Sequence, residues 1–201
     1  MDLIDSLIKK GCLKTPGIIE ALKNVKRVDF LPEGFGHLSG LDEALPIGYN
    51  QTISQPFTVA FMLELLSPKK DDKVLDIGSG SGWTTALLSF IVGEKGKVFA
   101  LEIVPELLEF GKKNVSKYNF VEKGTAQFLL KDGKEGYKEM APFDKILCSA
   151  SAEVIPLKLK EQMAEGGRMV ISVKSSIFLV KKEKGKIIEE EYPGFTFVPL
   201  I

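Results

Sequence analysis

The chain has 201 residues, a length that fits one domain with a sizeable core. Lys plus Arg and Asp plus Glu each number 27, so no overall charge would recruit nucleic acid or an anionic membrane. Two distant cysteines, Cys12 and Cys148, and the single His37 give neither a disulfide framework nor a metal-site spacing. We therefore expect a soluble, cytoplasmic monomer with no metal, no nucleic acid and no membrane partner.

The first fifty residues predict helices followed by irregular chain. Apolar residues at helical spacing indicate a helix that starts near Leu3 and ends at Gly11. Thr15 followed by Pro16 is typical of an N-cap and the first position of a second helix. Residues 27–32 close this helical part, and the glycine-rich residues 34–48 predict irregular structure. We expect residues 1–50 to form a preface to an α/β core of residues 51–201, within a single domain.

Residues 51–66 predict a helix that begins at Pro56. Either Ser54 or Gln55 can cap it, because both precede the proline at its first position. Local physics favours Ser54 as an N-cap over a chemical role. The two roles are compatible, since the N-terminus of a helix also attracts carboxylates.

Residues 73–83 read K-V-L-D-I-G-S-G-S-G-W and predict a strand, a glycine loop and the start of a helix. This geometry presents backbone N–H groups to a ligand. The dinucleotide pattern G-x-G-x-x-G fails, because Trp83 or Thr85 stands at its last position, and the Gly-Lys-Ser/Thr of a P-loop is absent. The D-x-G-x-G-x-G that remains resembles the S-adenosylmethionine loop of class I methyltransferases. A plain turn is disfavoured, since three glycines cost conformational entropy.

The rest of the chain alternates strands with helices, which predicts an α/β fold with a doubly wound, mostly parallel sheet. Glu102 ends the second strand, 26 residues after Asp76, where an acid typically accepts hydrogen bonds from ribose hydroxyls. Further polar residues also follow strands, so we expect one crevice at the carboxyl ends of the sheet. The predicted strands are 97–101, 127–130, 143–148 and 169–173, the helices 105–117 and 157–163, the antiparallel edge hairpin 177–182 with 186–190, and a final extended segment 195–200.

Nearly the whole chain resembles one family, the protein-L-isoaspartate O-methyltransferases. The most specific match is G-Y-N-Q-T-I-S-Q-P at residues 48–56, close to the family's G-x-G-Q-T-I-S-x-P. The chain departs from the family pattern at four places: Asn50, Phe57, Lys131 and Ser172-Val173-Lys174. Further matches are V-L-D-I-G-S-G-S-G at 74–82, D-G at 132–133, A-P-F-D at 141–144, Ile155-Pro156 and E-G-G-R at 165–168.

The resemblance implies a Rossmann-like class I fold and methyl transfer from S-adenosyl-L-methionine to the α-carboxylate of L-isoaspartyl residues in damaged proteins. The ester would start repair through a succinimide, with S-adenosyl-L-homocysteine as the other product and no metal. Ser54 corresponds to the family's active-site serine, and it would bind substrate together with Val198 and Pro199. The residues implied to bind the cofactor are Gln51, Thr52, Ile53, Asp76, Gly78, Ser79, Gly80, Gly82, Glu102, Ile103, Asp132 and Gly133.

Two other functions stay open from the sequence. One is a class I methyltransferase that acts on a different carboxylate or peptide acceptor, and the other is a non-catalytic S-adenosylmethionine-binding module. The intact loop around Ser54 argues against a pure sensor, which has no use for a group that holds a carboxylate. A base amino-methyltransferase is disfavoured, because residues 149–152 read S-A-S-A in place of a D-P-P-Y-type motif.

Overall fold

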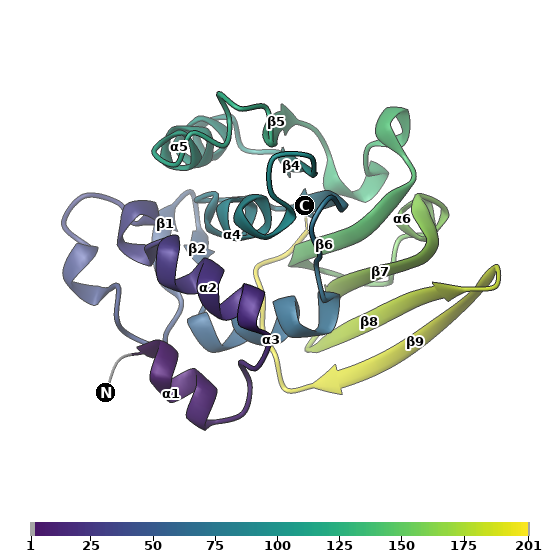
Figure 1. The fold of residues 1–201 in the computed structure, drawn as a ribbon, viewed down its shortest axis with the longest axis horizontal. Helices are drawn as coiled ribbons and strands as arrows, with labels where there is room; N and C mark the ends of the chain where they lie inside the picture. The colour runs from purple at the N-terminus through teal and green to yellow at the C-terminus, as the bar shows by residue number, and fades with distance from the viewer. Residues whose placement is uncertain (1–2, 201) are drawn as a thin grey trace.

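The computed structural model describes residues 3–200. Its centre is a seven-stranded sheet in the order β5-β4-β3-β6-β7-β8-β9 (Figure 1). Strands β3 to β7 are parallel, and β8 and β9 form an antiparallel edge. This confirms the predicted α/β architecture and its edge hairpin. The strands are β3 (Lys73–Ile77), β4 (Lys97–Glu102), β5 (Ala126–Leu130), β6 (Phe143–Ala152), β7 (Met163–Val173), β8 (Ser176–Glu183) and β9 (Lys186–Pro193).

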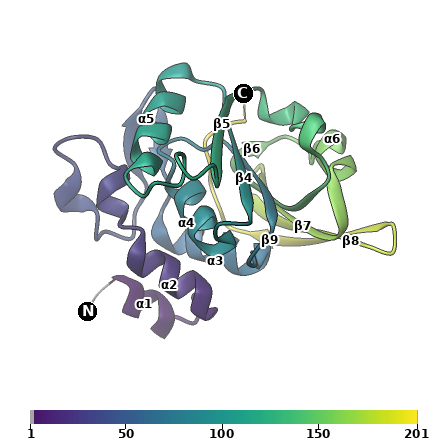
Figure 2. The ribbon, with the colours of Figure 1, turned by 45° about the horizontal axis from the view of Figure 1, so that its top comes forward.

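Helices cover both faces of the sheet because residues of each strand alternate between two hydrophobic cores. Val74 and Leu147 lie in the core beneath the larger helices, whereas Leu75 and Ile146 point to the opposite face. The first core joins α1 (Leu3–Lys9), α2 (Pro16–Asn24), α3 (Pro56–Leu66), α4 (Trp83–Val92) and α5 (Pro105–Ser116) to the sheet (Figure 2). The second core is covered by α6 (Leu157–Glu161) and lies near the 3₁₀ turns η3 (Gly133–Glu135) and η4 (Lys138–Met140). Two more 3₁₀ turns, η1 (Arg27–Phe30) and η2 (Gly36–Leu38), follow α2.

The strand order reverses between β3 and β6, which are neighbours in the sheet. Ligands of open α/β sheets bind outside the carboxyl ends of the strands at such a switch point. The C-terminal segment returns from β9 to this place and lies beside β6 (Figure 1). The Ser151 N–H donates to the Val198 carbonyl, and the Leu200 N–H donates to the Ser151 carbonyl, both at 2.8 Å.

The prediction of irregular chain through residue 48 was wrong in its last four residues. Leu45–Gly48 forms strand β1, which pairs antiparallel with β2 (Gln51–Ile53). Tyr49 and Asn50 between them have φ of 53° and 56°, the positive φ that two-residue hairpin turns favour. Four residues are too few to reveal strand alternation in a sequence. Residue 50 therefore lies in the turn of a hairpin that joins the predicted preface to the core.

Strands β6 and β7 are longer than predicted because each contains a bulge. The pairing register shifts between Cys148 and Ser151, so Ser149 and Ala150 belong to a strand that was predicted to end at Cys148. The register shifts a second time between Phe143 and Lys145. Phe143 pairs with Met163, so β7 begins at Met163 and not at the predicted Met169. The predicted helix 157–163 ends at Glu161 for the same reason, since residues from Met163 onward pair with β6.

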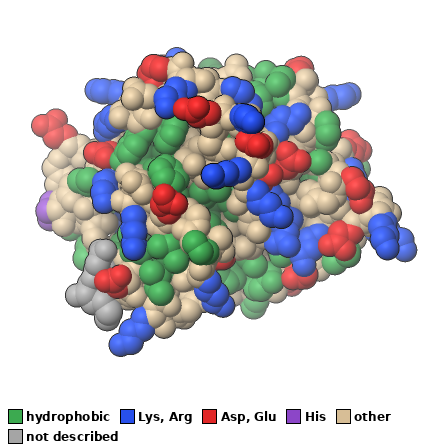
Figure 3. Space-filling model, viewed as in Figure 1, with side chains coloured by type: hydrophobic (Ala, Val, Ile, Leu, Met, Phe, Trp, Pro, Cys, Tyr) green, Lys and Arg blue, Asp and Glu red, His purple; other side chains and the backbone are tan. Residues whose placement is uncertain are grey.

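Positive and negative side chains are interspersed over the face shown in Figure 3. This agrees with the equal numbers of acidic and basic residues in the sequence. None of the helices within residues 3–200 has the length and apolarity needed to cross a bilayer.

Candidate functional site

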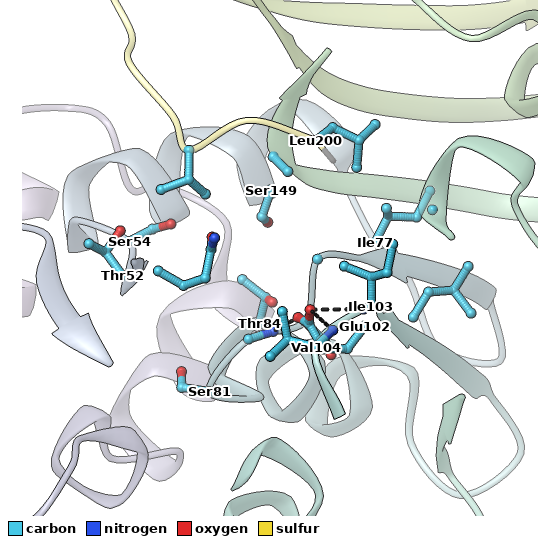
Figure 4. Close-up of a pocket in the computed structure, with 18 of the residues that line it drawn as sticks. Thr52, Ser54, Ile77, Ser81, Thr84, Glu102, Ile103, Val104, Ser149 and Leu200 are labelled. Carbon is cyan, nitrogen blue, oxygen red and sulfur yellow. Dashed lines mark hydrogen bonds between the residues drawn. The ribbon is translucent and has the colours of Figure 1, made fainter. Parts of the chain in front are cut away.

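A cleft opens at the carboxyl ends of β3, β4 and β6, where the strand order reverses (Figure 4). It contains about 790 Å³ of space, counting the part open to solvent. Its walls come from six separate parts of the chain. The lining residues are Gln51, Thr52, Ile53, Ser54, Val59, Ile77, Gly78, Ser79, Gly80, Ser81, Trp83, Thr84, Leu101, Glu102, Ile103, Val104, Lys131, Gly133, Ser149, Ala150, Val198, Pro199 and Leu200.

The glycine loop between β3 and α4 contains glycines with two different tasks. Gly78 has φ of 73°, lines the cleft, and would place an added Cβ at an ordinary 3.6 Å from the Ala150 Cβ. An added Cβ at Gly82 would lie 2.7 Å from the Gly111 carbonyl oxygen and 2.8 Å from the Val115 Cγ2. Gly82 is therefore required where the loop packs against α5, and it does not line the cleft.

Glu102 holds the glycine loop in shape from the end of β4. Its Oε2 accepts a hydrogen bond from the Gly80 N–H at 2.9 Å, and its Oε1 accepts from the N–H groups of Ile103 at 2.9 Å and Val104 at 3.1 Å (Figure 4). The residue is buried but lines the cleft. A carboxylate offers about four lone-pair positions, so this one can accept a further hydrogen bond from a ligand.

Asp76 lies behind the loop and does not line the cleft. Its Oδ2 accepts hydrogen bonds from the hydroxyls of Thr85 at 2.6 Å and Thr84 at 3.0 Å. Burial raises the pKa of its carboxyl to about 6, although these two hydrogen bonds oppose the shift. Asp76 thus anchors the start of α4 to β3, and it influences the cleft only by shaping the glycine loop.

Ser54 does not cap α3, contrary to the expectation from local physics. Gln55 occupies the N-cap position, and its side chain makes no capping hydrogen bond. The carboxylate of Asp42 provides the cap from another part of the chain, since its Oδ1 accepts from the Phe57 N–H at 2.8 Å. The hydroxyl of Ser54 makes no hydrogen bond within residues 3–200 and faces the cleft (Figure 4). It is therefore free for chemistry.

A second, more open groove meets the cleft at four shared residues: Thr52, Ser54, Ser149 and Val198. Ser54 comes from the segment before α3, Ser149 from the bulge in β6, and Val198 from the C-terminal segment. The other residues that line the groove are Ala44, Gln55, Phe57, Thr58, Pro193, Gly194, Phe195, Thr196 and Phe197. A molecule in the cleft and a chain in the groove would meet at Ser54.

Most of the predicted site residues come together in this cleft, and three do not. Asp76 and Gly82 lie behind the loop, and Asp132 accepts a hydrogen bond from the Lys134 N–H at 2.8 Å without lining the cleft. The predicted residues that line it are Gln51, Thr52, Ile53, Ser54, Gly78, Ser79, Gly80, Glu102, Ile103, Gly133, Val198 and Pro199.

Several lining residues were not among the predicted site residues. Most of them lie at the end of a predicted strand, directly after one or at the start of the next helix, whereas Val59 lies within a predicted helix and Leu200 in the final extended segment. They are Val59, Ile77, Ser81, Trp83, Thr84, Leu101, Val104, Lys131, Ser149, Ala150 and Leu200.

Cys148 and His37 do not form a nucleophilic pair. Cys148 is fully buried in β6, and burial raises the pKa of its thiol to about 12, so it stays protonated near neutral pH. His37 is exposed on η2. In the described part of the chain, no three His, Cys, Asp or Glu side chains gather in a way that could hold a metal ion.

Comparisons with known proteins agree with the resemblance seen in the sequence. The family model described as "Protein-L-isoaspartate(D-aspartate) O-methyltransferase" matches residues 1–201. A protein-L-isoaspartate O-methyltransferase of Fervidobacterium nodosum is 42% identical over 187 residues, which cover 91% of this chain and 92% of the relative. The enzyme of that name from Methanopyrus kandleri is 39% identical over 204 residues, 99% of this chain and 89% of the relative.

Solved structures share the fold over almost its whole length. A protein-L-isoaspartate O-methyltransferase of Plasmodium falciparum, in complex with S-adenosyl-L-homocysteine, superposes with a TM-score of 0.89 at 24% identity and covers 99% of this chain and 96% of its own. Another protein-L-isoaspartate O-methyltransferase superposes with a TM-score of 0.88 at 27% identity, covering 98% of this chain and 64% of its own. With the full-length family match and relatives of about 40% identity, this chain belongs to the protein-L-isoaspartate O-methyltransferase family.

Proposed function

We propose that the protein transfers the methyl group of S-adenosyl-L-methionine to the α-carboxylate of L-isoaspartyl residues in damaged proteins and peptides, which initiates repair through a succinimide. Family membership supports this reaction. The observation that carries the proposal is the position of Ser54, whose hydroxyl lies where the cleft meets the open groove. A small-molecule donor on one side and a polypeptide acceptor on the other need such a junction.

The cleft fits S-adenosylmethionine by its polar wall. The Ser79 hydroxyl and the Trp83 indole N–H are buried without a hydrogen-bond partner in residues 3–200, and both residues line the cleft. Buried polar groups are normally paired, so these two are suited to a ligand. Glu102 would hold the ribose hydroxyls, and Ile103 and Gly133 would border the adenine.

The remaining residues that the family resemblance implies for cofactor binding fall into two groups, those that line the cleft and those that lie behind its walls. Gln51, Thr52 and Ile53 would contact the donor directly, together with Gly78, Ser79 and Gly80 of the loop. Asp76, Gly82 and Asp132 would act by shaping the walls, because their side chains or backbone lie behind it.

The chemistry needs orientation more than acid–base catalysis. A carboxylate has a reference pKa of about 3.5–4 and is ionised at neutral pH, so no general base is required. When bound, S-adenosylmethionine supplies an electrophilic methyl group on a sulfonium. Ser54 would donate its hydroxyl proton in a hydrogen bond to one carboxylate oxygen while the other oxygen attacks in line. The walls of the cleft would exclude water from between the opposite charges.

The acceptor peptide would lie along the groove beside the C-terminal segment. The backbone of that segment is fixed by its two hydrogen bonds to Ser151, so Val198 and Pro199 offer a rigid edge. Val198 contributes to both the cleft and the groove, which suits a residue that borders the acceptor near the transferred methyl group.

The decisive experiment uses two peptides that differ only in an L-isoaspartyl or a normal aspartyl linkage. We expect methyl transfer from labelled S-adenosylmethionine to the isoaspartyl peptide alone, and unchanged transfer in EDTA because no metal takes part. Equal methylation of both peptides would favour a different carboxylate acceptor. Cofactor binding without transfer to either peptide would favour the non-catalytic module.

We further propose that the chain acts as a single-domain monomer in the cytoplasm, with no nucleic-acid or membrane partner. The balanced charge and the interspersed surface charges support the absence of nucleic-acid and membrane partners. Sedimentation analysis across a concentration series tests the assembly state, and a second species at working concentration would contradict it.

A further inference from the structure

The buried Arg27 has no part in the function described so far. It lies on η1 and is 6% exposed. A buried charge is usually paired with an opposite charge, but within residues 3–200 the guanidinium group of Arg27 donates its hydrogen bonds to carbonyl oxygens. Its Nη1 donates to the carbonyls of Leu41 at 2.9 Å and Ser39 at 3.3 Å, and its Nη2 donates to those of Glu43 at 2.7 Å and Ser54 at 3.3 Å. Burying a charge is costly without strong partners, so this arrangement calls for a reason.

The four carbonyl groups belong to two segments next to the proposed active site. Three of them are in residues 39–43, which we call the 39–43 loop, and the fourth is that of Ser54 itself. Burial lowers the pKa of Arg27 only to about 10, so the guanidinium stays charged at neutral pH. A planar, charged fork is the one side chain that can donate to four carbonyls at once, whereas lysine offers three donors from a single point.

The 39–43 loop in turn holds the residues that follow Ser54. The Gln55 Nε2 donates to the Asp42 carbonyl at 2.9 Å, and the Asp42 Oδ1 accepts from the Phe57 N–H at 2.8 Å. The direct contact of Arg27 with the Ser54 carbonyl is long at 3.3 Å, so the route through Asp42 is the stronger one. The backbone at Ser54 is thereby held by three contacts: at the Ser54 carbonyl, at the Gln55 side chain and at the Phe57 N–H.

Arg27 also lies against Trp83, which lines the cleft. Its guanidinium carbon lies 5.5 Å from the ring centroid of Trp83, the first residue of α4 after the glycine loop. A cation over an indole face is an attractive contact. One side chain thus joins the cofactor side of the cleft to the segment that presents Ser54.

We propose that Arg27 is a positioning residue for methyl transfer, which fixes the Ser54 hydroxyl at the junction of cleft and groove through the 39–43 loop. It lines neither the cleft nor the groove. This inference rests on the proposed role of Ser54. A purely structural Arg27 would affect folding and leave the turnover of folded enzyme unchanged.

The test compares Arg27→Lys with Arg168→Lys. The chain has only these two arginines, and Arg168 likewise donates to a backbone carbonyl, that of Leu65 at 3.1 Å, at the other end of α3. At a temperature where both variants are folded, we expect Arg27→Lys to lower kcat for the isoaspartyl peptide roughly tenfold to a hundredfold, as displacement of a reacting group does. S-adenosylhomocysteine affinity should stay within about twofold, and Arg168→Lys should keep wild-type kcat.

A double-mutant cycle then asks whether Arg27 acts through Ser54. In a Ser54→Ala background, Arg27→Lys should reduce kcat much less than it does in the wild-type background, because the hydroxyl to be positioned is gone. The same fold reduction in both backgrounds would overturn the proposal. Wild-type kcat in Arg27→Lys would overturn it as well, while failure of the wild-type enzyme to methylate the isoaspartyl peptide would instead defeat the proposed function.

Asp42 supplies a second arm, which keeps Arg27 and its four carbonyl partners and removes a carboxylate that favours the charged guanidinium. This arm decides the question if Arg27→Lys fails to fold. Asp42→Ala removes the acceptor for the Phe57 N–H and should lower kcat, whereas Asp42→Asn keeps an acceptor oxygen and should restore most of it. Both lose the ion pair between Lys10 and Asp42, 3.2 Å long, so Lys10→Ala is the control for that pair. Equal kcat in Asp42→Ala and wild type would exclude the 39–43 loop as the route.

Discussion

The Glu102 Oε2 accepts a hydrogen bond from the Gly80 N–H at 2.9 Å, which ties the end of β4 to the middle of the glycine loop. The same carboxylate accepts from two further backbone N–H groups. A residue expected to hold a ribose thus also shapes the loop that would hold the rest of the cofactor, so its two roles can be separated only by measuring both.

Glu102→Ala leaves buried backbone donors unpaired and removes an acceptor from the cleft. We expect a loss of about 1–3 kcal/mol in S-adenosylhomocysteine affinity and a comparable loss in unfolding free energy, because each unpaired buried donor costs about that much. Glu102→Gln keeps one acceptor oxygen, so its affinity and its unfolding free energy should lie between those of the wild type and of Glu102→Ala. Calorimetry and thermal denaturation measure the two effects, and unchanged affinity in Glu102→Ala would remove the residue from the cofactor site.

Ser54→Ala should be nearly silent for stability, since the hydroxyl caps no helix. Surface substitutions of this kind change the unfolding free energy by less than about 0.5 kcal/mol. Loss of a hydrogen bond to a carboxylate should instead cost about 1–3 kcal/mol in turnover. Melting curves and steady-state kinetics test both claims, with the half-buried Ser116 of α5 replaced by alanine as the control. Normal turnover in Ser54→Ala would take the serine out of the mechanism.

Gly82→Ala and Gly78→Ala should fail in different ways. A methyl group at Gly82 meets the Gly111 carbonyl at 2.7 Å, so we expect destabilisation on the order of 3 kcal/mol from overpacking and a strained φ. A methyl group at Gly78 has room beside Ala150 but enters the cleft, so it should weaken S-adenosylhomocysteine binding with about 1–2 kcal/mol of strain. Denaturant titration and calorimetry distinguish them, and equal stability losses would refute the division of roles.

The buried carboxyl of Asp76 should make the protein less stable as pH rises from about 4 to about 6. Its folded pKa of about 6 lies above the unfolded value of 3.8, so the folded state binds the proton more tightly in this interval. The contribution is fully present below pH 4 and is lost as pH passes the folded pKa; two pKa units correspond to about 3 kcal/mol. Subtracting the pH profile of Asp76→Asn from that of the wild type isolates the effect, and a flat difference would contradict it.

The groove beside Ser54 predicts a preference for uncharged neighbours of the isoaspartyl residue. None of its lining residues is ionisable, and it presents Phe57, Phe195 and Phe197. A charged side chain would lose hydration there without gaining a partner. We expect lower kcat/KM for peptides with Glu or Lys beside the isoaspartyl residue than for those with Phe or Leu.

Phe57→Ala is the matching variant, because Phe57 stacks on Phe61 with ring centroids 6.3 Å apart and borders the groove. It should raise KM for peptides with apolar neighbours and leave a peptide with glycine neighbours almost unchanged. The same rise for both peptides would show that the ring supports the fold without choosing the substrate.

Most of the order of strands and helices, the glycine loop and the acid at the end of β4 could be predicted from the sequence alone, whereas the hairpin of β1 and β2 could not. These features are local: apolar periodicity, glycine at positions of positive φ, and a residue that directly follows a strand. Local information also placed Glu102 and the glycine loop in one crevice, since the carboxyl ends of parallel strands share one edge of the sheet. Ser54 was assigned to the site only through the resemblance to the family.

The contacts that these residues make with one another became visible only in the folded structure. Asp42 replaced Ser54 as the cap of α3, and Gly82 proved to serve packing against Gly111. Arg27 reached the Ser54 carbonyl across 27 positions of the chain. Such contacts join residues far apart in sequence, and they depend on how helices and loops pack around the sheet. A hydrogen bond across that distance has no periodic pattern in the sequence, so only the folded arrangement reveals it.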